Sequence, residues 1–120
     1  MGSRWYAVVV DATDPARLAR WWAEVLDYRI ASEGPEEVTI SGGDAAPSLT
    51  FVPATETKAG KNRLHIDLNP DDQEAEVERL VNMGARRVDI GQGDVPWVVL
   101  ADPEGNEFCV LAARDQGEQA

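Results

Sequence analysis

The chain contains little of the two residue types that most often build metal sites and crosslinks. Its 120 residues include one cysteine, Cys109, and one histidine, His65. A single cysteine excludes an intramolecular disulfide and a cysteine-rich zinc site. A chain of this length can still bury a core that is large enough to keep the fold stable without a disulfide or a structural metal. We therefore expect one globular domain that is stabilised by its apolar interior.

Long apolar runs are also missing. The first apolar stretch, WYAVVV at residues 5–10, is too short for the core of a signal peptide and lacks a cleavage pattern. No stretch approaches the roughly 20 apolar residues that cross a bilayer. We therefore expect a cytoplasmic protein with no membrane partner.

Basic residues are few. The chain has 11 Lys and Arg against 22 Asp and Glu, which gives a net charge of −11. Because contacts from Lys and Arg to phosphates supply most of the affinity for nucleic acid, this balance argues against a nucleic-acid partner and against an anionic membrane. Two interpretations of the charge remain open. It either serves solubility alone or attracts a cationic small molecule to an acidic cleft.

The order of predicted elements occurs twice along the chain. In the first half, apolar patterning and turn residues predict a strand, a helix and three strands at residues 4–12, 13–28, 28–32, 36–42 and 48–53. In the second half, the same order is predicted at residues 63–69, 70–84, 85–91, 95–103 and 107–113.

This repeat predicts an α+β fold of two βαβββ modules. We expect module one at about 4–54, a connector at 55–62, module two at about 63–112 and a polar tail at 113–120. Neither module can cover its sheet alone, so pairing into one domain is expected. The sheets would then form a curled mixed sheet with a concave cleft, where a ligand would bind.

The stretch RLHIDL contains the only histidine. Leu64, Ile66 and Leu68 alternate with Arg63, His65 and Asp67. This period of two predicts a strand with one apolar face on the core and three ionisable side chains on the other.

Three stretches resemble the vicinal oxygen chelate superfamily, which holds the glyoxalases, bleomycin-resistance proteins and extradiol dioxygenases. They are DATDPARLARWWAEVLDY at 11–28, NRLHIDL at 62–68 and LADPEGNEFCVL at 100–111, of which the DPEGN turn is the most specific. The resemblance runs from Trp5 to about Ala112, and within the superfamily the chain is similar to a glyoxalase-like group. It implies the paired βαβββ fold and a small-molecule site in the cleft.

The resemblance also implies positions for a divalent metal, from which this chain departs. Metal-binding members use a His on the first strand, a His on the strand opening the second half and a Glu on the last strand, often with a further Glu from the fourth strand. The first three positions fall on Ala7, His65 and Cys109, and no Glu lies within 48–53. Since a catalytic metal needs about three protein ligands, we predict no metal site and no cofactor. The alternative is a weakly held divalent ion such as zinc. His65 and Cys109 would bind it if Glu107 or Asp67 moved inward.

Alternation along the outer strands also predicts which side chains line the cleft. The predicted ligand-binding residues are Trp5, Ala7, Val9, Arg63, His65, Asp67, Trp97, Glu107 and Cys109. The residues predicted to face the helices are Tyr6, Val8, Val10, Phe108 and Val110. On the fourth strand, Leu49 and Phe51, or else Thr50 and Val52, would line the cleft. Apolar walls with a few polar groups are typical of small-molecule sites.

Several of these residues also have a structural interpretation. His65 can be a half-buried histidine bonded to Asp67 or Glu107, and Cys109 a small apolar filler. Arg63 and Asp67 can form an exposed ion pair of little energetic value. Cys109 as a nucleophile is disfavoured because carboxylates on the same face oppose a thiolate.

The functional prediction is a small-molecule-binding protein of the drug-resistance type, without a tightly bound metal. The ligand would be a small aromatic or cationic organic molecule, and the protein a homodimer. The alternative is a lyase- or isomerase-type enzyme in which His65 acts as general acid or base on a small metabolite. A third class, a structural or interaction module, would require side chains to fill the cleft.

Overall fold

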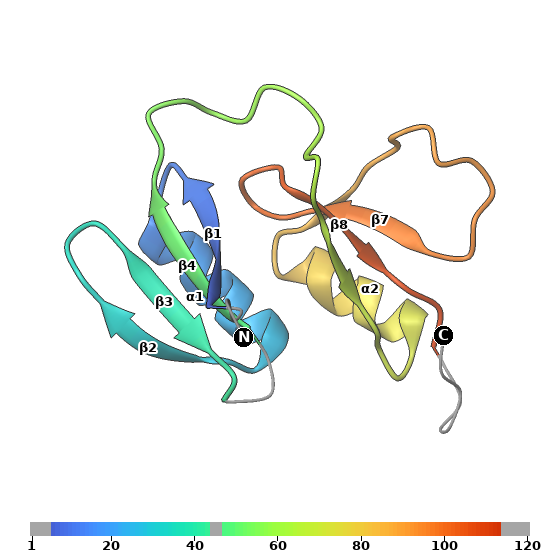
Figure 1. The fold of residues 1–120 in the computed structure, drawn as a ribbon. Coiled ribbons are helices and arrows are strands. Elements are labelled where there is room, and N and C mark those ends of the chain that lie inside the picture. The colour runs from blue at the N-terminus through green and yellow to red at the C-terminus, as the bar shows by residue number, and fades with distance from the viewer. Residues whose placement is uncertain (1–5, 44–46, 114–120) are drawn as a thin grey trace, which may run out of the picture. The chain divides into compact units, whose positions relative to one another are not determined.

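The computed structural model describes residues 6–43 and 47–113, so Trp5 lies outside the described residues. The chain forms two compact units, residues 1–57 and 58–120, and each is described by itself. Each unit has the order strand, helix, three strands, with its helix against a four-stranded mixed sheet (Figure 1). The predicted α+β fold of two βαβββ modules is therefore confirmed.

Module one builds its sheet from a parallel and two antiparallel strand pairs. Its elements are β1 (Ala7–Ala12), α1 (Pro15–Leu26), β2 (Arg29–Glu33), β3 (Val38–Ser41) and β4 (Ser48–Pro53). The strand order is β1-β4-β3-β2, and the β1–β4 pair is the parallel one. Leu49 and Phe51 are buried in the core, so alternation places Thr50 and Val52 on the opposite face of β4.

Local sequence explains where α1 begins and ends. The Asp14 side chain accepts a hydrogen bond from the backbone N–H of Arg17 at 3.2 Å, and Pro15 occupies the first turn. The helix ends at Leu26, and the C-cap residue Asp27 takes the left-handed conformation with φ 56°. Trp21 and Trp22 are both buried and meet edge to face with ring centroids 5.1 Å apart.

Gly42 follows β3 where the chain passes closely over an aromatic ring. A Cβ at this position would lie 2.4 Å from Cε1 of Tyr28, and the Tyr28 hydroxyl donates to the carbonyl of Pro47 at 3.3 Å. We expect Gly42→Ala to lower the free energy of unfolding by about 1–3 kcal/mol, because the ring must move. Urea denaturation measures this loss. Gly60→Ala is the control, since no atom lies within 4 Å of its Cβ position, and equal losses in the two variants would contradict the prediction.

Module two repeats the topology of module one. Its elements are β5 (Ile66–Leu68), α2 (Gln73–Asn82), β6 (Arg86–Arg87), β7 (Val98–Ala101) and β8 (Glu107–Val110). The strand order is β5-β8-β7-β6, with β5 and β8 parallel. No helix in the described part of the chain has the length and apolar content to cross a membrane.

The core of module two lies between α2 and one face of this sheet. Asp72 caps α2 by accepting from the backbone N–H of Ala75 at 3.1 Å. Val77 and Leu80 of α2 are buried, as are Leu100, Phe108 and Val110 of the central strands.

Two apolar residues predicted to face the core are exposed instead. Leu64 is 86% exposed and Tyr6 is 91% exposed. Residues 63 and 64 form a bend, and β5 begins only at Ile66. Tyr6 likewise precedes the first residue of β1. The alternation rule therefore fails at both positions because no strand pairing exists there to enforce it.

The predicted strand at 85–91 is also much shorter than expected. Arg86 and Arg87 are the register partners of β7, and the backbone N–H of Val88 adds one hydrogen bond to the carbonyl of Val99 at 3.1 Å. Gly91 and Gly93 both have positive φ, and the chain between β6 and β7 is irregular. Turn residues thus end the strand sooner than the apolar pattern indicated.

Candidate functional site

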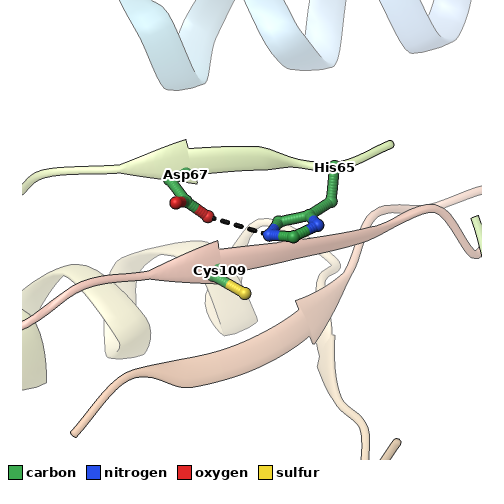
Figure 2. Close-up of side chains that lie close together, drawn as sticks. All are labelled: His65, Asp67 and Cys109. Carbon is green, nitrogen blue, oxygen red and sulfur yellow. Dashed lines mark ion pairs between the residues drawn. The ribbon is translucent and has the colours of Figure 1, made fainter. Parts of the chain in front are cut away.

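The side chains of His65, Asp67 and Cys109 lie close together beside the paired strands β5 and β8. Asp67 and Cys109 are register partners in the parallel ladder, so their side chains lie on the same face of the sheet. His65 precedes β5, and its Nε2 lies 3.1 Å from Oδ1 of Asp67. One ligand atom from each of these residues lies within 4.8 Å of the other two. Figure 2 shows the imidazole and the carboxylate pointing toward each other, with the thiol beside them.

This cluster of His65, Asp67 and Cys109 lies on the sheet face opposite α2. Val98 of β7 lines a groove together with Val77 and Val81 of α2, and its register partner is Val110. Because side chains alternate, the neighbouring pair Val99 and Cys109 faces away from the helix. The cluster is therefore separate from the core between α2 and the sheet.

Accessibility differs sharply within the cluster. The side chains of His65 and Asp67 are 42% and 50% exposed, whereas Cys109 is buried. Burial raises the pKa of the Cys109 thiol, the charge of Asp67 raises it further, and Lys61 opposes both only in part. The free thiol is therefore protonated at neutral pH and is a poor nucleophile.

Glu107 lies on β8 but is occupied by the connector. Its carboxylate accepts from Lys58 Nζ at 2.9 Å and from the backbone N–H of Asn62 at 2.9 Å. Asn62 Nδ2 also donates to Oδ1 of Asn106 at 3.1 Å. Burial alone would raise the pKa of Glu107, but the bonds from Asn62 and Lys58 outweigh it and hold this pKa below its usual value. Glu107 thus fixes the chain segment that leads to His65.

We expect Glu107→Gln to lower the free energy of unfolding by about 1–2 kcal/mol at neutral pH, because charged hydrogen bonds are lost. Since the folded-state pKa is lowered, this contribution is full above the ordinary carboxyl value. It disappears as the pH falls through the folded-state value. Urea denaturation from neutral to acidic pH should therefore show the two proteins converging on the acidic side. The exposed residue Glu56 gives the control, Glu56→Gln, and a gap that stays constant with pH would contradict the expectation.

The remaining predicted residues of module two lie apart from the cluster. Arg63 is in the bend before β5 and forms no hydrogen bond or ion pair with the described residues. Trp97 precedes Val98, at the end of the sheet where Val98 pairs with Val110. His65 instead precedes Ile66, at the end where Phe108 pairs with Leu100.

In module one, Ala7 and Val9 lie on β1, and Val9 is 61% exposed. Val9 pairs with Thr50 of β4, which in turn pairs with Thr39 of β3. The two threonine hydroxyls are hydrogen bonded at 2.9 Å. The structure therefore places Thr50 rather than Leu49 beside the predicted position Val9.

Sequence reasoning missed two features of module two. Lys58 and Asn62 lie in the predicted connector, whose sequence has no periodicity that would indicate their bonds to Glu107. A groove of about 650 Å³ also runs along α2. It is lined by Glu74, Val77, Glu78, Val81, Arg87 and Val98, among others. Glu and Val recur on α2 at spacings of three and four residues, which puts them on one face of the helix. This pattern could have indicated that face as the wall of a groove.

The residues at the metal positions of the vicinal oxygen chelate superfamily do not fit the ligand set implied for its metal enzymes. Ala7 has no donor atom, and Cys109 offers a thiol where the metal-binding members have a carboxylate. The β4 sequence SLTFVP has no carboxylate either. Hard ions such as Mg²⁺ and Mn²⁺ prefer carboxylate oxygens, so one intact position, His65, does not make that site.

Comparison with solved structures finds the same fold in proteins of low sequence identity. A glyoxalase/bleomycin resistance protein/dioxygenase family enzyme from Burkholderia phytofirmans is 18% identical with a TM-score of 0.69, covering 87% of this chain and 94% of that one. The fosfomycin resistance protein FosX from Mesorhizobium loti is 19% identical with a TM-score of 0.69, covering 95% and 94%. The oxidase ChaP-H1 is 22% identical with a TM-score of 0.65, covering 98% and 100%.

A search of curated proteins found no matching sequence. The sequence profile of one family, described as the glyoxalase-like domain, matches residues 7–111. This range includes both modules and all three residues of the cluster. The chain therefore belongs to the glyoxalase-like domain family, within the vicinal oxygen chelate superfamily.

Proposed function

We propose that this protein binds a small organic molecule of aromatic or cationic character at the cluster of His65, Asp67 and Cys109. The observation that carries the proposal is the half-exposed pair of His65 and Asp67 beside a buried, protonated thiol. It combines an accessible negative charge, a hydrogen-bonding imidazole and an apolar floor. In small-molecule sites, a few polar groups of this kind fix the orientation of the ligand.

The charge of the chain supports this choice of ligand. The net charge of −11 favours a cation over an anion, and Asp67 supplies a local carboxylate. Solved structures with the same fold include two named as fosfomycin resistance proteins. These names support a small-molecule role of the resistance type in general, while the choice of a cationic ligand depends on charge.

Thermal shift with defined probes tests the proposal on metal-free protein. Benzyltrimethylammonium combines an aromatic ring with a fixed positive charge, and benzoate is its anionic counterpart. We expect the cation to raise the melting temperature in a concentration-dependent way and benzoate to leave it unchanged.

A variant and its matched control locate the binding. Asp67→Asn should weaken binding of benzyltrimethylammonium at least about fivefold, because a charge-assisted contact is lost. Asp71→Asn removes an exposed charge nearby in sequence and should bind like the wild type. Absence of any shift with the cation, or equal affinity in Asp67→Asn, would overturn the proposal.

A second candidate function is catalysis by His65. The geometry that favours it is the contact from Nε2 to Asp67, which orients the ring. Among the described residues, Nδ1 has no hydrogen-bond partner, so it is available to a substrate proton. If the protein is a lyase or isomerase of this kind, His65→Ala abolishes turnover in a metabolite mixture followed by NMR while ligand affinity persists. Loss of affinity without any wild-type turnover favours the binding protein.

We also propose that the chain forms a homodimer. The edge strand β2, all of whose residues are exposed, is the kind of surface that a second copy covers. Light scattering on the eluted protein should give twice the chain mass of 13.1 kDa. A single-chain mass at high protein concentration would reject the dimer.

A further inference from the structure

We propose that His65, Asp67 and Cys109 form a binding site for one thiophilic divalent cation of the Zn²⁺ class. The site differs from the hard-ion ligand set of the metal enzymes in using a thiol and in drawing every ligand from module two. The inference does not depend on the organic ligand proposed above, because the ion can be titrated without it.

The backbone already holds two of the ligands together. Asp67 and Cys109 are paired across the parallel ladder of β5 and β8, so the fold fixes their separation. His65 reaches the same face from two residues earlier and contacts Asp67 at 3.1 Å. All three ligand atoms lie within 4.8 Å of one another.

Only a small adjustment closes this group around an ion. Tetrahedral zinc with bonds of about 2.0–2.3 Å sets its ligand atoms about 3.3–3.8 Å apart. The most distant pair in the cluster must therefore approach by roughly 1 Å. The side chains of His65 and Asp67 are about half exposed and can rotate, whereas the buried Cys109 provides the fixed point.

The donor types determine which ion is favoured. One imidazole nitrogen, one carboxylate oxygen and one sulfur suit zinc, while a thiolate disfavours Mg²⁺ and Mn²⁺. The nearest further carboxylate on β8, Glu107, is held by Lys58 and Asn62. Three protein ligands with a fourth position left to water are typical of accessible zinc sites. On binding, the thiol proton passes to solvent.

Titration of tag-free, chelator-treated protein with Cd²⁺ tests the site without any activity assay. Because Cys109 is the only cysteine, a thiolate-to-metal charge-transfer band in the ultraviolet reports on this site alone. We expect the band to saturate at one ion per chain and to be absent in Cys109→Ser. Zn²⁺ should displace Cd²⁺ and raise the melting temperature, while Mn²⁺ and Mg²⁺ should do neither.

Two surface variants keep the test decisive if Cys109→Ser folds poorly. His65→Ala and Asp67→Asn should each lower the affinity for Zn²⁺ at least about tenfold, since even outer-shell losses cost that much. Asp71→Asn is the matched control and should bind like the wild type. The proposal is overturned if the band is missing in the wild type, if both variants bind as tightly as the wild type, or if Mn²⁺ competes equally.

Discussion

Replacing Asp102 with alanine is expected to lower the free energy of unfolding by about 3 kcal/mol, because buried donors lose their acceptor. Asp102 is 1% exposed and begins the turn between β7 and β8. Its Oδ1 accepts from the backbone N–H groups of Glu104 and Asn106, both at 2.9 Å. Asn106 Nδ2 adds contacts of 3.2 and 3.1 Å to the two carboxylate oxygens.

The matched variant Asp102→Asn separates the backbone hydrogen bonds of this carboxylate from its charge and its contact with Asn106. Its amide oxygen can still accept from both backbone N–H groups, but its NH₂ cannot accept from Asn106. We therefore expect a smaller loss of about 1 kcal/mol. Urea denaturation measures both variants. An alanine variant within about 0.5 kcal/mol of the wild type would contradict the role assigned to this carboxylate.

Phe108→Ala is expected to cost about 3–5 kcal/mol, because it removes a large side chain from a closed core. Phe108 is 1% exposed and lies on β8 between its register partners Ile66 and Leu100. The same strand carries Cys109, so loosening β8 should also weaken the cluster. The loss is measured by denaturation.

Tyr6→Ala provides the contrasting aromatic truncation. Because Tyr6 is 91% exposed, its removal should change the free energy of unfolding by no more than about 0.5 kcal/mol. Comparable losses in the two variants would show that Phe108 does not hold the core of module two.

The shared face of Asp67 and Cys109 could be predicted from sequence because a strand ladder enforces alternation there. Asp67 and Cys109 lie within paired strands, and counting by twos along each strand placed them on one face. Leu64 obeyed the same count in the sequence, yet it lies in a bend. The bend follows Asn62, whose backbone bonds to Glu107, and such a long-range contact leaves no periodic signal.

The fold was predictable for a different reason. The strand–helix order occurs twice, and helix caps such as Asp14 and Asp72 stand where local chemistry requires them. The turn at Asp102 uses its side chain in the way that Asp commonly stabilises turns. These signals are local in the sequence and can be recognised there. The groove along α2 depends on which strand the helix covers, and this packing cannot be recognised from local sequence.

The most direct measurement is amide chemical-shift mapping of isotope-labelled, metal-free protein titrated with benzyltrimethylammonium. The expected result is a set of concentration-dependent shifts centred on residues 65–67 and 107–109, which is reduced in Asp67→Asn. Shifts confined to the groove along α2, or no shifts at all, would contradict the assignment of ligand binding to His65, Asp67 and Cys109.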